Sequence, residues 1–144
     1  ASDQAQKLML TWLVTYPGIF DKVAQYLNAE DFIVPLYKEV AQMLFRQREE
    51  EGQVNPAKLL NSFTDSEEQK EVASLFNATI HLETKEEQQR AFSDALIRIK
   101  QESLAEKNKN WDPADMGALQ ELVKAKKNLE ELGRKRQQLH ISFE

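Results

Sequence analysis

Cysteine is absent from the 144 residues of the sequence. Its absence excludes disulfide frameworks, thiolate zinc sites and cysteine nucleophiles together, and it fits a reducing compartment. The two histidines, His81 and His140, stand far apart in the chain and form no recognisable metal-binding motif. We therefore expect a cytoplasmic protein that binds no metal and no cofactor.

Glycine and proline are scarce, with four of each. Four scattered glycines do not provide the strained turns of a phosphate-binding loop or a nucleophile elbow, and no Ser/His/Asp set is evident. The acidic runs at residues 49–51 and 67–68 lie at expected helix ends, where such runs are usually solvated rather than bound to magnesium. The sequence therefore predicts no catalytic site in this chain.

Long apolar runs are missing too, since none approaches the roughly 20 residues that a membrane span needs. Residues 1–4 show neither a basic nor an apolar signal region, and the chain begins without methionine and enters a helical pattern at once. We expect a fragment of a longer protein that does not enter a membrane. The net charge of −5 argues against a surface devoted to polyanions.

What the sequence does contain is helical periodicity. Apolar residues make up 41% of the chain and charged residues 30%, a balance typical of a folded protein. Apolar residues recur at helical spacing in six stretches, at residues 5–16, 19–27, 36–45, 59–63, 72–80 and 92–99. We predict an all-α protein with a compact helical bundle, followed by a long helix and a C-terminal antiparallel helical hairpin.

Local signals place several helix ends. Gly52 should end the helix that Pro35 opens, because glycine readily adopts the left-handed conformation of a C-terminal cap. Side chains that can cap helix N-termini are found at Asn28, Asn55, Thr64, Thr84 and Asp112, with Glu67 and Glu87 completing two capping boxes. Pro113, directly after Asp112, should open the final helix.

The C-terminal third has a thinner apolar stripe than the rest. Ile97, Leu104 and Trp111 recur once per heptad, which suits a single partner helix better than a globular core. We therefore divide the chain into a bundle subdomain at residues 1–98 and a hairpin subdomain at residues 99–144. Part of the hairpin should project beyond the bundle, and the two subdomains should be separable.

Apolar residues near the hairpin turn are the main candidates for a binding site. A two-helix unit has little core to receive them, so they either pack locally across the turn or form an exposed patch that binds a protein partner. The chain end is also unusually apolar. The candidates for binding are Trp111, Met116, Leu119, Leu122, Ile141 and Phe143.

The best basic cluster comprises Lys124, Lys126, Lys127, Arg134, Lys135 and Arg136, and the last three are further candidates for binding. Glu121, Glu130 and Glu131 stand at helical pairing distance, so one interpretation is a solvated face that pairs with itself. The alternatives are a basic edge that meets an acidic protein partner and direct contact with nucleic acid. We do not expect direct nucleic-acid binding, because no aromatic residue interleaves the cluster to stack on bases.

Four segments together resemble a known family. The segments are 12–20 (WLVTYPGIF), 27–32 (LNAEDF), 35–40 (PLYKEV) and 52–55 (GQVN). Their order is similar to that in the C-terminal domain of bacterial DNA primase and in the related N-terminal domain of the replicative helicase. The primase version appends a helical hairpin, as residues 100–144 are expected to do.

The resemblance implies a domain without enzymatic activity that binds the N-terminal domains of the hexameric replicative helicase. The hairpin would dock, and the bundle would modulate helicase activity, coupling primer synthesis to fork unwinding. The parent chain would be a primase whose zinc and polymerase domains lie outside this sequence, and the fragment would be monomeric. The alternatives are the helicase's own N-terminal oligomerisation domain and a helical adaptor that binds nucleic acid.

Overall fold

The computed structural model describes residues 2–77 and 84–136, and within those ranges it contains helices and no β-strand. This confirms the prediction of an all-α protein. The elements in chain order are α1 (Ser2–Thr15), the 3-10 helix η1 (Pro17–Ile19), α2 (Phe20–Ala24), the 3-10 helix η2 (Ala29–Asp31), α3 (Pro35–Glu51), α4 (Pro56–Asn61), α5 (Ser66–Asn77), α6 (Lys85–Asn110) and α7 (Met116–Arg134).

Most of the predicted helix ends are confirmed. Gly52 follows α3 with a φ of 74°, the left-handed conformation that favours glycine. The Asn28 side chain accepts a hydrogen bond from the Glu30 N–H, and the side chains of Asn55 and Thr84 accept from the third backbone N–H beyond them. Each cap satisfies a donor that the helix itself leaves without a partner.

Two predicted caps are wrong. α5 begins at Ser66, and Asp65 rather than Thr64 accepts a hydrogen bond from the Glu67 N–H, at 2.9 Å. α7 begins at Met116, where Asp115 accepts from the Ala118 N–H at 3.1 Å. Asp112 instead bonds the Ala114 N–H within the preceding turn. In a helix cap and in a tight turn, an aspartate side chain accepts the same kind of hydrogen bond, from a backbone N–H two or three residues further along. Several aspartates that stand close together therefore compete to start one helix.

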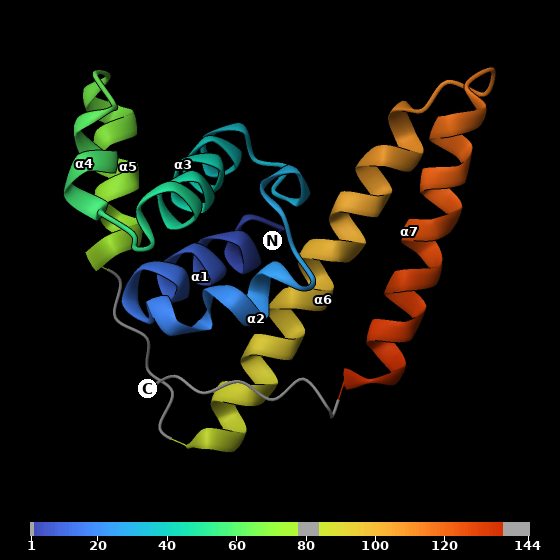
Figure 1. Ribbon diagram of the computed structural model, residues 1–144, viewed down its shortest axis with the longest axis horizontal. Helices are drawn as coiled ribbons and strands as arrows, with labels where there is room; N and C mark the ends of the chain where they lie inside the picture. Colours follow the sequence, from blue (N-terminus) through green and yellow to red (C-terminus); the bar gives the residue numbers. More distant parts are fainter. Residues whose placement is uncertain (1, 78–83, 137–144) are drawn as a thin grey trace.

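The core is built around α1, which packs against α3, α5 and α6 (Figure 1). The largest fully buried side chains include Trp12 and Phe92, whose ring centroids lie 6.1 Å apart. Tyr37 on α3 donates a hydrogen bond to Glu71 on α5 at 2.7 Å, and burial together with this bond raises the pKa of Tyr37. The bundle therefore has an extensive core of its own.

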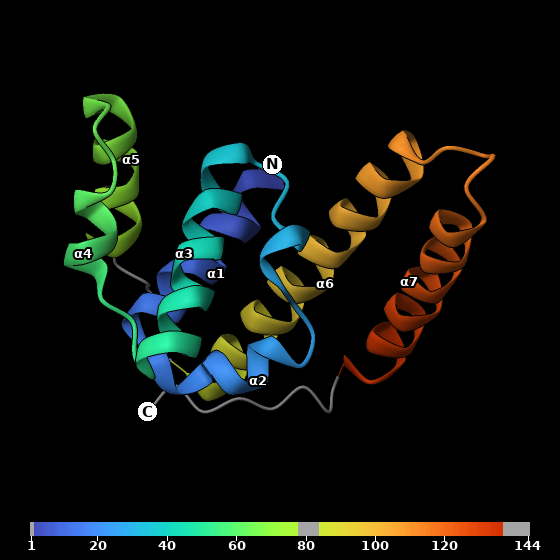
Figure 2. The ribbon, with the colours of Figure 1, turned by 45° about the horizontal axis from the view of Figure 1, so that its top comes forward.

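α6 extends beyond that core and forms a hairpin with α7. Its first half packs on α1, and its second half continues away from the bundle (Figures 1 and 2). α7 runs back antiparallel to α6, which lies between α7 and the rest of the bundle. The predicted subdomain boundary at residues 98 and 99 falls inside α6, so one continuous helix serves both parts. In residues 2–77 and 84–136, no helix contains a stretch sufficiently apolar to span a lipid bilayer.

Candidate functional site

α7 has two faces of different character, set by its helical period. Successive residues turn by about 100° around a helix axis, so residues seven apart lie on nearly the same side. Met116 and Val123 share one side in this way, and their exposed fractions are 64% and 58%. Within the described residues, these are the large hydrophobic side chains that are exposed. The outer face of α7, defined by Met116, Gln120, Val123, Lys127 and Arg134, therefore offers apolar surface to a partner.

The inner face of α7 packs against α6. Leu122 is only 5% exposed, and Leu132 is buried as well. Ala118, Ala125 and Leu129 lie on the same side of the helix and are partly buried. The expectation that Leu122 belongs to an exposed patch is therefore wrong, because its position on the helix points it at α6. Sequence reasoning chose Leu122 and passed over Val123, although the seven-residue spacing from Met116 was a usable signal.

Leu119 lies between these two faces of α7, whereas Trp111 follows the end of α6, and both are half-buried. Trp111 follows α6 in an extended conformation, so its side chain leaves the helix at the hairpin turn. Together with Leu122 it lines a shallow depression between the ends of the two helices. Local packing across the turn therefore accounts for part of the burial of Trp111, which remains partly exposed.

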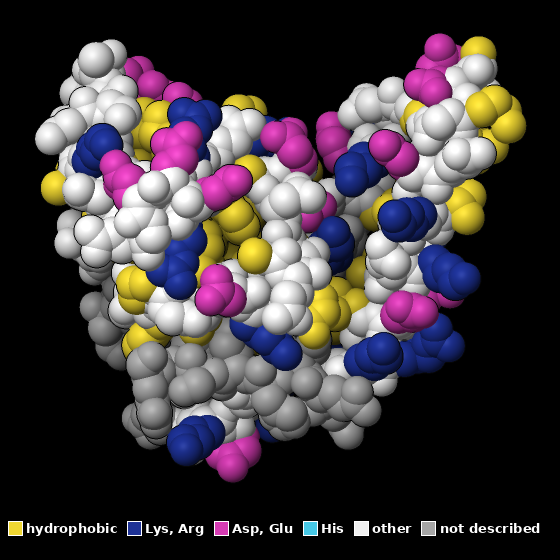
Figure 3. Space-filling model, viewed as in Figure 1, with side chains coloured by type: hydrophobic (Ala, Val, Ile, Leu, Met, Phe, Trp, Pro, Cys, Tyr) yellow, Lys and Arg dark blue, Asp and Glu magenta, His cyan; other side chains and the backbone are white. Residues whose placement is uncertain are grey.

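Cationic side chains gather along the edge of the molecule that α7 forms (Figure 3). Lys124, Lys126, Lys127, Arg134 and Lys135 are exposed, and none of them forms an ion pair with a described residue. These five cations are therefore solvated as expected, but the self-pairing expected for them is absent among the described ion pairs. Arg136 is the exception, because its guanidinium pairs with Asp94 on α6.

The sequence of residues 6–110, more than half of the chain, matches the protein-family model described as DNA primase DnaG DnaB-binding. The chain belongs to this family. It is thus a primase domain that binds the replicative helicase, and the resemblance found in the sequence is confirmed. The family is defined by binding rather than by a reaction. No curated protein and no solved structure matches the chain.

The family match ends at Asn110, the last residue of α6, so α7 lies beyond the matched stretch of this DnaB-binding domain. Two of the residues predicted to bind the helicase, Ile141 and Phe143, lie outside the described residues, as do both histidines. Within residues 2–77 and 84–136, no group of three or more His, Asp or Glu side chains could hold a metal ion.

Proposed function

We propose that the outer face of α7 is the surface through which this DnaB-binding domain docks on the N-terminal domains of the hexameric helicase. The observation that carries the proposal is the pair of exposed apolar side chains, Met116 and Val123, on one side of a helix. Apolar side chains of this kind become anchors when a partner removes them from water, and the surrounding cations form a polar rim.

The bundle then modulates helicase activity, and the two parts together couple primer synthesis to fork unwinding. The parent chain is a cytoplasmic primase that makes RNA primers, with its zinc and polymerase domains outside this sequence, and the domain is a monomer. These statements rest on the resemblance and on the family. They extend the helicase binding that the family itself establishes.

A second docking surface is favoured by one observation, the end of the family match at Asn110. If the family's shared binding function resides in the matched residues, α6 or the bundle would carry the contact. Direct nucleic-acid binding by the outer face has less support, because its exposed apolar side chains are a methionine and a valine. Neither can stack on a base as an aromatic ring does.

Replacing Met116 or Val123 by alanine tests the proposal. Each change is expected to weaken helicase binding by about 2 kcal/mol, roughly 30-fold in Kd, because it removes an anchor at the centre of the interface. The stability of the free domain should change by less than about 0.5 kcal/mol, since both side chains are exposed. Calorimetry measures the first quantity and urea denaturation the second.

Val54→Ala is the matched control, because Val54 precedes α4 on the bundle and is partly buried there. Like Val123→Ala, it removes two methyl groups from a valine. It is expected to leave the helicase Kd within twofold of that of the unaltered domain. Full binding by the double variant Met116→Ala/Val123→Ala would place the docking surface elsewhere.

The rim cations should behave differently from the anchors. Replacing Lys127 or Arg134 by glutamine is expected to weaken binding by less than about 1 kcal/mol, mainly through a slower association rate. The salt dependence of the association rate should also become shallower, because exposed charges act through a field that salt screens. Stopped-flow association at several salt concentrations measures both effects.

Lys70→Gln, on the distant α5, is the control and should change neither the association rate nor its salt dependence. An unchanged salt dependence in Arg134→Gln would show that Arg134 does not belong to the rim.

A further inference from the structure

Asp31 is a buried carboxylate at the end of η2, and its side chain is only 2% exposed. It accepts a hydrogen bond from the Asn28 N–H at 3.0 Å, which closes the turn locally. It also accepts one from the Ser103 hydroxyl at 2.8 Å, and both of its oxygens lie 3.2 Å from the Lys100 ammonium. A charge buried this deeply requires such partners, because desolvation without them costs several kcal/mol.

The two distant partners share one helix. Lys100 and Ser103 lie on the same side of α6, 69 and 72 residues further along the chain than Asp31. They follow Ile99, the last fully buried apolar residue of α6. The Asp31–Lys100–Ser103 cluster therefore joins the bundle to α6 at the point where α6 leaves the core and becomes the first arm of the hairpin.

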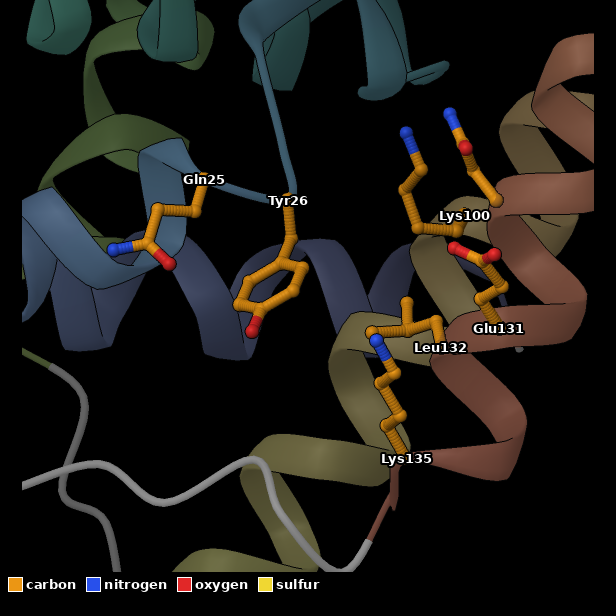
Figure 4. A pocket seen from close by; sticks show the side chains of 7 residues that line it. Gln25, Tyr26, Lys100, Glu131, Leu132 and Lys135 are labelled. Carbon is orange, nitrogen blue, oxygen red and sulfur yellow. The ribbon is translucent and has the colours of Figure 1, made fainter.

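Packing beside the cluster is open. A groove of about 320 Å³ separates Gln25 and Tyr26, at the end of α2, from Asn128, Glu131 and Lys135 on α7 (Figure 4). Lys100 lines the same groove, with Leu132. Of the α7 residues that the structure describes, Leu132 is the one that belongs to the main core cluster. The groove thus leaves few contacts to fix the angle between bundle and hairpin on this side.

We propose that Asp31 is a positioning residue for helicase engagement, acting through Lys100 and Ser103 to hold the hairpin at one angle to the bundle. Hydrogen bonds to a carboxylate are directional, whereas apolar contacts across an open groove tolerate rotation. This inference rests on the proposed function, in which the hairpin docks and the bundle modulates. Without the cluster, the hairpin still binds, but the bundle no longer reaches a fixed position on the helicase.

The first test measures the angle directly. The chain contains no cysteine, so cysteines placed at Glu39 on α3 and Lys126 on α7, both exposed, take two spin labels without side reactions. We expect a narrow distance distribution by double electron–electron resonance in the otherwise unaltered domain. Asp31→Asn and Lys100→Met should each at least double its width. Lys100→Met is included because it keeps an unbranched side chain and leaves the Asp31–Ser103 bond, should Asp31→Asn fold poorly.

Glu30→Gln is the matched control, because it changes the neighbouring carboxylate, whose partner Lys38 lies 3.9 Å away in an exposed ion pair. It should leave the distribution unchanged, while circular dichroism confirms that every labelled variant is folded. A merely stabilising role would lower the melting temperature of the folded variants without widening the distribution. Narrow, unshifted distributions in folded Asp31→Asn and Lys100→Met would overturn the proposal.

The second test measures function with the same variants in the intact domain. Asp31→Asn should bind the helicase with a Kd within about threefold of that of the unaltered domain, since the outer face of α7 is untouched. The change that it produces in the unwinding rate should be at least fivefold smaller than the change produced by the unaltered domain. Retention of the full change would overturn the positioning role. If the unaltered domain binds without changing the unwinding rate, or if Val123→Ala binds fully, the proposed function fails, whatever the spin labels show.

Discussion

Removing residues 111–144 is expected to abolish the stable complex with the helicase and to leave a folded bundle. The truncation deletes α7 and the hairpin turn, and with them both exposed anchors, Met116 and Val123. Loss of two anchors, each contributing roughly 30-fold, should weaken binding by about 1,000-fold. The bundle should stay folded, because the largest fully buried side chains all precede residue 97.

Calorimetry of residues 1–110 against the helicase measures this loss, and circular dichroism confirms that the truncated domain is helical. The truncation keeps every residue of the family match, which spans 6–110. The experiment therefore separates the two docking surfaces considered above. A folded truncation that binds as tightly as the whole domain would assign docking to α6 or the bundle.

Of the substitutions considered, Phe92→Ala should lower the free energy of unfolding most. The ring is fully buried on α6 and packs against Trp12 on α1, with the two ring planes 52° apart. Truncation to alanine leaves a large cavity between the two helices that form the centre of the core, and costs about 3–5 kcal/mol. Since a domain of this size is stable by roughly 5–15 kcal/mol, a substantial part of its stability would be lost.

Urea denaturation followed by circular dichroism measures the change in the free energy of unfolding. Phe45→Ala is the comparison. Phe45 packs against Phe20, with their ring centroids 5.1 Å apart, but it is only half-buried. We expect a clearly smaller loss there. A loss below about 1 kcal/mol for Phe92→Ala would mean that α6 does not pack on α1 as described.

The helical bundle could be predicted from the sequence because its signals are local. Gly52 ends a helix by its own backbone freedom, and Asn55 and Thr84 begin helices with their own side chains. The errors occurred where two capping residues stand close together. Thr64 competes with Asp65, and Asp112 competes with Asp115, and the backbone geometry around each start decides between them.

The candidate site was less predictable, because the rotation of α7 about its axis is set by packing on α6. Leu122 and Val123 are neighbours in the sequence, yet the first is buried and the second exposed. Only the period shared by Met116 and Val123 pointed to the outer face. The Asp31–Lys100–Ser103 cluster gave no local signal at all, since its members stand up to 72 residues apart.

The claim that the domain docks through the outer face of α7 is tested most directly by amide hydrogen exchange of the domain, alone and bound to the helicase. Exchange in the complex should slow over residues 116–134, because a partner that binds folded α7 suppresses its local opening. Exchange over α3, α4 and α5 should slow far less. Strong protection of the bundle, with α7 exchanging as fast as in the free domain, would contradict the claim.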